Sequence, residues 1–166
     1  MNDDVPGALV SHEETVRPEW VDYNGHMNVA YYVLVFDHGT DAFLDHAGLG
    51  QDYREGTGHS VFVVEAHVTY EGEVGDGERL RVATRLLGHD AKRLHLFHEM
   101  HRLGDGRPVA TNELMFVHVD LRTRRAVPFP EAARTRIGSL ERAHAALPRP
   151  AKAGRAIGLG PKPPGP

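Results

Sequence analysis

The chain has 166 residues, 40% of them hydrophobic, which is enough for one domain with a substantial core. Its formal net charge of −4 disfavours a nucleic-acid partner, because proteins that bind nucleic acids usually present a basic face. The sequence contains no cysteine, which excludes a thiol nucleophile, a disulfide framework and thiolate zinc sites.

Residues 1–12 are predicted to form a loose N-terminus. No segment is apolar over a length that spans a bilayer, and the first ten residues are too acidic and polar for a signal peptide. We therefore expect a cytoplasmic protein without a membrane partner. His12 to Val21 is predicted as a first strand, and Pro18 within it indicates an edge position or a bulge.

The next stretch, WVDYNGHMN from Trp20 to Asn28, gathers an acid, an imidazole and two amides around Gly25. A helix is predicted directly after it, from about Asn28, a good capping residue, to Gly48. Its apolar positions recur at steps of three and four residues: Val29, Tyr32, Val33, Phe36, Thr40, Phe43, Leu44 and Ala47. The free N–H groups and the positive dipole end of this helix then face the polar stretch.

A loop is predicted from Gly48 to Gly58, and after it the apolar period changes to two. Val61–Tyr70 is predicted as a strand whose core face carries Phe62, Val64, Ala66, Val68 and Tyr70. Short turns separate further strands around 80–86, 94–100 and 109–120, and a helix is predicted over 130–147. Residues 148–166 are rich in Pro and Gly and are predicted to be disordered. The order predicts an α+β domain over 13–147, with a five-stranded antiparallel sheet wrapped around one long helix.

Three blocks of this sequence resemble the betainyl-CoA thioesterases, a family of hotdog-fold acyl-CoA thioesterases that also occur fused to L-carnitine dehydrogenase. The blocks are PEWVDYNGHM at 18–27, VEAH at 64–67 and DAKRLHLFH at 90–98. The spacing of Asp22, Asn24, His26 and Asn28 is also similar to the active-site motif of plant acyl-ACP thioesterases. The resemblance implies the hotdog fold, hydrolysis of a small acyl-CoA without a cofactor, and a homodimer or a dimer of dimers.

By this resemblance, Asp22 is the base or nucleophile at the thioester, and Asn24 and His26 position it or bind the oxyanion. Backbone N–H groups from Gly25 to Asn28 are expected to polarise the carbonyl. Glu65 is the expected second acid, although its place off the core face also fits a solvent or interface role. Glu73, which follows Tyr70 as in the plant enzymes, is the other acid, and Val74 stands where those enzymes have a cysteine. The expected substrate-binding residues are Trp20, Tyr23, Gly25, Met27 and Asn28.

Other interpretations of the same residues remain open. Without the resemblance, Asp22 and Asn24 are equally well explained as turn and cap residues, and His26 as a structural histidine. A hotdog hydratase or dehydratase and a non-catalytic acyl-CoA-binding domain are the alternative functions. For metal, the run from His98 to His101 is a near miss to H-E-x-x-H on a predicted strand, where the two histidines point to opposite faces, so no metal site is predicted.

Overall fold

A computed structural model describes residues 9–160; residues 1–8 and 161–166 lie outside the described part. Its elements follow in chain order: β1 (Val10–Thr15), a 3₁₀ turn (Pro18–Trp20), α1 (Val29–His46), α2 (Gln51–Thr57), β2 (His59–Tyr70), β3 (Arg79–His89), β4 (Arg93–Arg102), β5 (Pro108–Asp120), β6 (Arg125–Ala126) and α3 (Glu131–Ala145). No described helix has the length and apolar character needed to cross a membrane.

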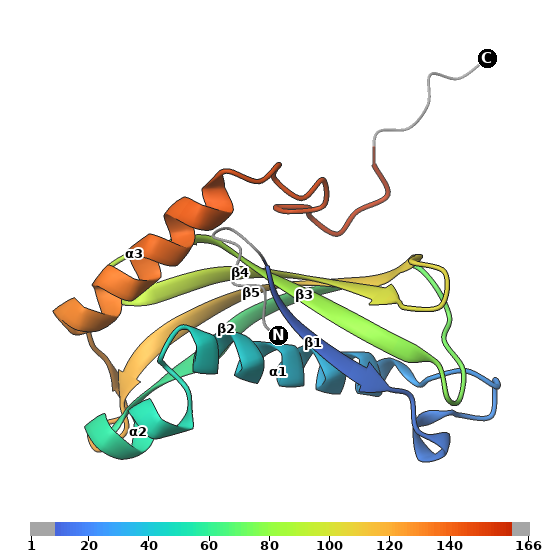
Figure 1. Cartoon of the computed structure of the whole chain (residues 1–166), viewed down its shortest axis with the longest axis horizontal. Helices are drawn as coiled ribbons and strands as arrows, with labels where there is room; N and C mark the ends of the chain where they lie inside the picture. The colour runs from blue at the N-terminus through green and yellow to red at the C-terminus, as the bar shows by residue number, and fades with distance from the viewer. Residues whose placement is uncertain (1–8, 161–166) are drawn as a thin grey trace.

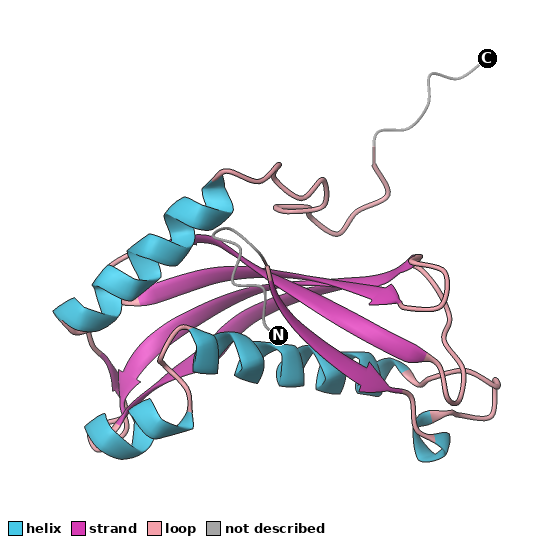
Figure 2. Ribbon diagram, in the orientation of Figure 1, coloured by secondary structure: helices cyan, strands magenta, loops and turns pink. Residues whose placement is uncertain are grey.

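The sheet is antiparallel with the order β1-β3-β4-β5-β2, and the two-residue β6 pairs with β5. It curls around α1, which lies along one face, while α3 packs against β3 (Figures 1 and 2). The inward side of α1 carries its buried residues: Tyr32, Val35, Phe36, Gly39, Thr40 and Phe43. One helix across one curled antiparallel sheet is the architecture that the periodicity predicts.

The ends of α1 follow the expected capping chemistry. The Asn28 side chain accepts a hydrogen bond from the Ala30 amide at 3.0 Å, and Gly48, at φ +67°, turns the chain away after the helix. The loop predicted between Gly48 and Gly58 is wrong in part, because α2 occupies most of it. This helix has only 7 residues, about two turns, and none of them is buried, so the sequence shows no apolar period there.

The core face assigned to β2 is wrong in its first half. The pairing of β2 with β5 shifts register between Val63 and Glu65, so a β-bulge adds one residue there. Before the bulge, Val63 lies opposite the buried Phe116 and is therefore on the same face of the sheet as Phe116. Phe62 and Val64, which are predicted to be on the core face, are not. After the bulge the predicted phase holds, because Ala66 lies opposite Leu114, whose side chain is buried in the core.

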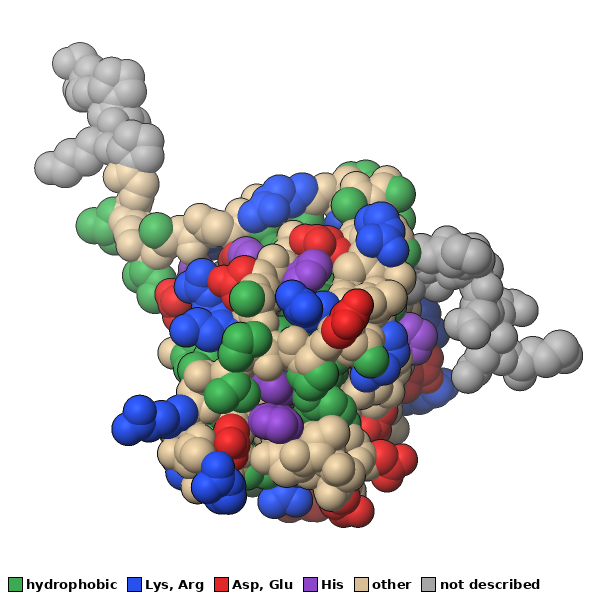
Figure 3. All heavy atoms as spheres, turned by 90° about the vertical axis from the view of Figure 1, so that its left-hand side faces the viewer, with side chains coloured by type: hydrophobic (Ala, Val, Ile, Leu, Met, Phe, Trp, Pro, Cys, Tyr) green, Lys and Arg blue, Asp and Glu red, His purple; other side chains and the backbone are tan. Residues whose placement is uncertain are grey.

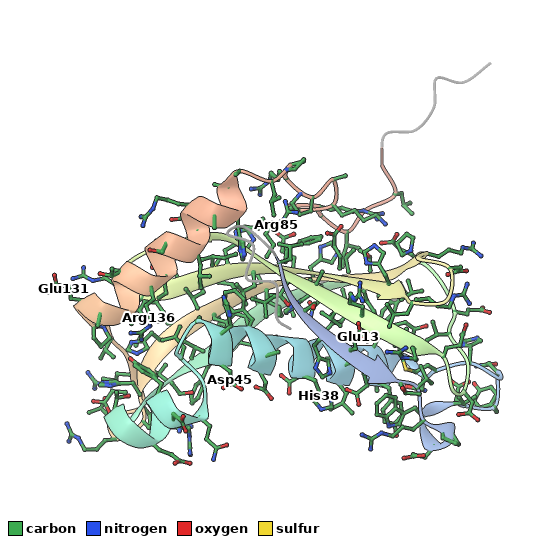
Figure 4. The ribbon with its side chains drawn as sticks, in the orientation of Figure 1. Glu13, His38, Asp45, Arg85, Glu131 and Arg136 are labelled. Atoms are coloured by element: carbon green, nitrogen blue, oxygen red, sulfur yellow. The ribbon has the colours of Figure 1, made fainter. Side chains whose placement is uncertain are left out.

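The C-terminal segment continues beyond α3 along the sheet (Figure 1). The carbonyl of Pro148 accepts a hydrogen bond from Arg85, the Gly154 amide donates to Glu113 at 2.7 Å, and Lys152 pairs with Glu71. These contacts give partners to Pro148, Lys152 and Gly154, in a tail for which the composition predicts disorder. Figure 4 shows Arg85 pointing toward this segment.

Candidate active site

The polar motif forms a closed loop between β1 and the N-terminus of α1. Val21 and Met27 face each other in an isolated antiparallel bridge, and the Asp22 amide donates to the His26 carbonyl at 3.1 Å. Gly25 makes the reversal at φ +84°, a conformation in which a side chain is strained. The positive φ explains why the motif has a glycine at position 25. The turn made there keeps the polar residues on both sides of Gly25 next to the start of α1.

The carboxylate of Asp22 is fixed through both oxygens. Oδ1 accepts a hydrogen bond from the Asn24 amide at 2.8 Å, and Oδ2 accepts one from Asn28 Nδ2 at 3.3 Å. Asp22 is half-buried, so its remaining lone pairs can reach a reactant. The geometry gives an oriented carboxylate at the positive end of a helix.

The second acid beside the motif is Glu73. Its Oε1 lies 3.5 Å from His26 Nε2, and the neighbouring Val74 carbonyl accepts a hydrogen bond from the Met27 amide at 2.8 Å. Glu65 lies elsewhere, on the exposed face of β2 opposite Met115, where it lines a cavity of about 470 Å³ with His67, His95 and Glu113. Within one chain, the structure therefore brings Glu73 to His26 of the motif, whereas Glu65 lies on another face of the molecule.

The predicted substrate-binding residues divide into buried and open ones. Trp20 is 4% exposed; Tyr31 stacks on it with ring centroids 5.4 Å apart, and the Arg17 guanidinium lies 5.0 Å from its centroid. Met27 is also buried, in the core cluster. Tyr23 is 97% exposed, whereas Gly25 and Asn28 shape the loop as described above.

Tyr70 is an aromatic neighbour of the site that the sequence pattern assigns to the core. Its side chain is 48% exposed, and its hydroxyl donates to the Val29 carbonyl at 3.4 Å, in the first turn of α1. Its ring also meets Tyr32 edge-on with centroids 5.3 Å apart. The edge position of β2 leaves the core face of its last residue open, a feature that alternation alone does not reveal.

Among the described residues 24–29, two backbone amides remain free to bind an oxyanion. The amides of Asn24, Gly25, Met27 and Asn28 already donate to protein oxygens. In the part of the chain that the structure describes, the amides of His26 and Val29 have no such acceptor. Of the backbone N–H groups from Gly25 to Asn28 that are expected to polarise the carbonyl, only that of His26 is therefore available. The Val29 N–H, in the first turn of α1, is available as well.

Figure 3 views the end of the molecule that carries α2 and α3. Basic and acidic side chains alternate over the described surface there, in agreement with the small net charge.

Comparison with known proteins identifies the family. The profile of the thioesterase-like superfamily matches residues 16–137. A betainyl-CoA thioesterase of Pseudomonas aeruginosa is 46% identical over 154 residues, which are 93% of this chain and 97% of that protein. A bifunctional L-carnitine dehydrogenase/betainyl-CoA thioesterase of Agrobacterium fabrum is 50% identical over 121 residues, 73% of this chain but 25% of that longer protein.

Among solved structures, a hypothetical protein of Staphylococcus aureus in complex with CoA superposes with a TM-score of 0.86 at 31% identity. The match covers 95% of this chain and 99% of that protein. The thioesterase-type hotdog fold predicted from the sequence is thus confirmed. The chain belongs to the thioesterase-like superfamily, and its activity is that of a thioester hydrolase.

Proposed function

We propose that this thioesterase hydrolyses a small acyl-CoA, betainyl-CoA in particular, to free coenzyme A and betaine in the cytoplasm. The observation that carries the proposal is the Asp22 carboxylate, held through both oxygens at the N-terminus of α1. It stands in a chain that shares 46% of its residues with a betainyl-CoA thioesterase over nearly the full length of both.

Two routes through Asp22 balance chemically. On the first, Asp22 takes a proton from a water whose oxygen bonds to the thioester carbon; the C–S bond then breaks, and the proton passes to the departing sulfur. On the second, an Asp22 oxygen bonds to that carbon and expels the thiolate, and water then hydrolyses the resulting anhydride. On both routes the carbonyl oxygen becomes an oxyanion, which the free amides of His26 and Val29 are available to bind.

Recognition of the betaine group needs aromatic faces and negative charge, because a trimethylammonium has no N–H to donate. Cation–π contact with such a group stabilises by about 0.5–1 kcal/mol when exposed and ~2 kcal/mol when desolvated. Trp20 is poorly placed for this role, because Tyr31 and Arg17 already cover its ring. We assign the aromatic surface to Tyr23 and Tyr70 and the negative charge to Glu73.

The exposed apolar surface supports a second copy of the chain as the partner. Three exposed apolar side chains lie on α1 (Val29, Val33 and Leu34), and three more lie on the edge strand β2 (Phe62, Val63 and Val64). The free edge of β2 can pair with the same strand of a second copy. We infer a two-fold symmetric homodimer, at least, with the acyl site at the subunit boundary.

The experiment compares two thioesters on wild type and on Asp22→Asn, by release of free thiol. Betainyl-CoA is set against 3,3-dimethylbutanoyl-CoA, in which a carbon replaces the nitrogen and removes the charge. We expect wild type to have the higher kcat/KM on betainyl-CoA, and Asp22→Asn to lose about 10²–10⁴-fold in kcat on both. A folded Asp22→Asn protein with wild-type turnover would exclude Asp22 as the catalytic group.

Equal rates on the two thioesters would remove betaine as the substrate and leave the hydrolase in place. A parallel assay with an enoyl-CoA measures water addition, the reaction of the alternative hydratase. Binding of acyl-CoA without release of thiol would instead identify a non-catalytic domain.

A further inference from the structure

A cluster of two histidines and one glutamate joins β1 to α1, away from the Asp22 loop. Glu14 Oε2 lies 2.6 Å from His38 Nδ1 and 3.1 Å from His12 Nε2. The three ligand atoms all lie within 4.8 Å of one another, and the Glu14 side chain is only 12% exposed. Among the described residues, no other group of three or more His, Cys, Asp or Glu converges in this way.

The strand and the helix both contribute to this convergence. His12 and Glu14 are two residues apart on β1, so they share a face. Glu13, between them, points to the other side and pairs with Arg79 and Arg81 of β3. His38 comes from the middle of α1, and Figure 4 shows it beside the strand that carries Glu13.

The donor set is one that transition metals prefer. Two imidazoles and one carboxylate oxygen suit Zn²⁺, whose ligands lie about 2.0–2.2 Å from the ion and hence roughly 3.3 Å from each other in a tetrahedron. The separation between Glu14 and His12 is close to this value, and that between Glu14 and His38 is shorter by the amount expected for a strong hydrogen bond. A cation bound to Glu14 Oε2 would replace the two hydrogen bonds that this oxygen now makes with His12 and His38.

The surroundings leave room for the remaining ligand. Arg17 contacts the other carboxylate oxygen of Glu14, Oε1, at 3.4 Å, so it does not occupy the face shared by the imidazoles. Asp41 follows His38 by three residues on α1, which places it on the same side of the helix. It or a water can complete a fourfold site.

We propose that His12, Glu14 and His38 bind a divalent transition metal ion of the zinc class, which clamps the edge strand β1 onto α1. The clamp closes the ends of the segment that contains the whole Asp22 motif, since residues 16–28 connect the two elements. Its role is structural, because none of the three ligands contacts the Asp22 loop in the described structure.

The test is isothermal titration of ZnSO₄ into the full chain, without a histidine tag and after EDTA treatment. Wild type should bind one ion tightly, and His12→Gln and His38→Gln should each weaken this binding by at least about 10-fold. The matched control is His46→Gln, at an exposed position of the same helix, which should bind as wild type does.

A second measurement, made on wild type alone, keeps the proposal testable if the variants fold poorly. On wild type, Zn²⁺ should shift the imidazole ¹⁵N resonances of two histidines together and raise the unfolding temperature. The absence of a stoichiometric site on wild type would overturn the proposal, and so would equal binding by His38→Gln and wild type. An equal loss in His46→Gln would overturn it as well.

Discussion

Asn28 serves both the helix and the candidate site with one side chain. Its Oδ1 caps α1 through the Ala30 amide at 3.0 Å, and its Nδ2 donates to Asp22 Oδ2 at 3.3 Å. The two atoms therefore link the start of the helix to the orientation of the carboxylate. Substitutions that keep one atom and remove the other can separate these roles.

Asn28→Asp keeps the cap, because aspartate caps as well as asparagine and its charge suits the helix dipole. It removes the donor to Asp22 and puts a like charge beside it. We expect an unfolding temperature close to that of wild type and a kcat lower by on the order of 10-fold or more, the value of a hydrogen bond to a charged group. Asn28→Ala should lose activity and also about 1 kcal/mol of stability. Wild-type kcat in Asn28→Asp would show that the contact does not position Asp22.

His98 is a buried residue whose environment determines its protonation. Thr40 Oγ1 donates to the Phe36 carbonyl, so it accepts from His98 Nε2–H at 3.0 Å, and Thr84 donates to Nδ1 at 2.8 Å. Burial disfavours the charged ring and lowers the pKa of His98 to about 3. The unfolded chain takes up this proton near pH 6.5, so stability from the neutral ring is fully present above pH 6.5 and is lost as pH falls toward 3.

We expect wild type to lose about 1.4 kcal/mol of unfolding free energy per pH unit from this residue as pH falls below 6.5. His98→Gln should lack that part of the pH dependence, although it is less stable at pH 7 because the core packing changes. Urea unfolding at pH 7, 6 and 5 measures the difference, with the exposed His46→Gln as the control. Parallel curves for His98→Gln and wild type would contradict the expectation.

At the scale of elements, α1 and β3 pack closely at Gly39. A Cβ built on Gly39 would lie 2.7 Å from Val82 Cγ1, and Val82 is fully buried. Gly39→Ala should therefore destabilise the protein by about 1–3 kcal/mol through overpacking, although alanine favours helix by about 1 kcal/mol. Thermal unfolding checks the sign. Gly39→Ala should cost less in a Val82→Ala background than in wild type, because the clashing methyl groups are then absent. A Gly39→Ala variant more stable than wild type would refute the packing argument.

Periodicity predicts an element when one face of it is buried. This explains why α1 and the strands β3 to β5 follow the predicted order, and why α2, with no buried residue, does not show in the pattern. The bulge in β2 is not visible either, because Val61 to Val64 are all apolar and support both phases. The Asp22 loop is predictable because its motif is local, whereas the choice between Glu65 and Glu73 depends on pairing distant in sequence.

At the scale of the whole molecule, the β2 edge of the sheet is suited to pairing with another chain. β2 pairs with β5 on one side only and carries the exposed apolar Phe62, Val63 and Val64, while α1 carries the exposed apolar Val29 and Val33. Apolar side chains along an unpaired strand are the pattern that proteins normally avoid unless a partner covers it. The free edge and the apolar surface therefore support the same inference, a dimer related by a two-fold axis near the middle of β2.

Val63→Asp tests this dimer. A two-fold axis brings the same residue from each copy to neighbouring positions, so the substitution places two like charges in an apolar interface, where both are desolvated. We expect wild type to be a dimer by light scattering at micromolar concentration, and Val63→Asp to shift toward monomer. Its thioesterase activity should fall with the dimer fraction and recover as protein concentration rises, if the acyl site lies at the subunit boundary as proposed. Ala132→Asp, at an exposed position of α3, is the matched control and should remain a fully active dimer. A monomeric wild type with full activity, or an active Val63→Asp monomer, would rule out a shared site.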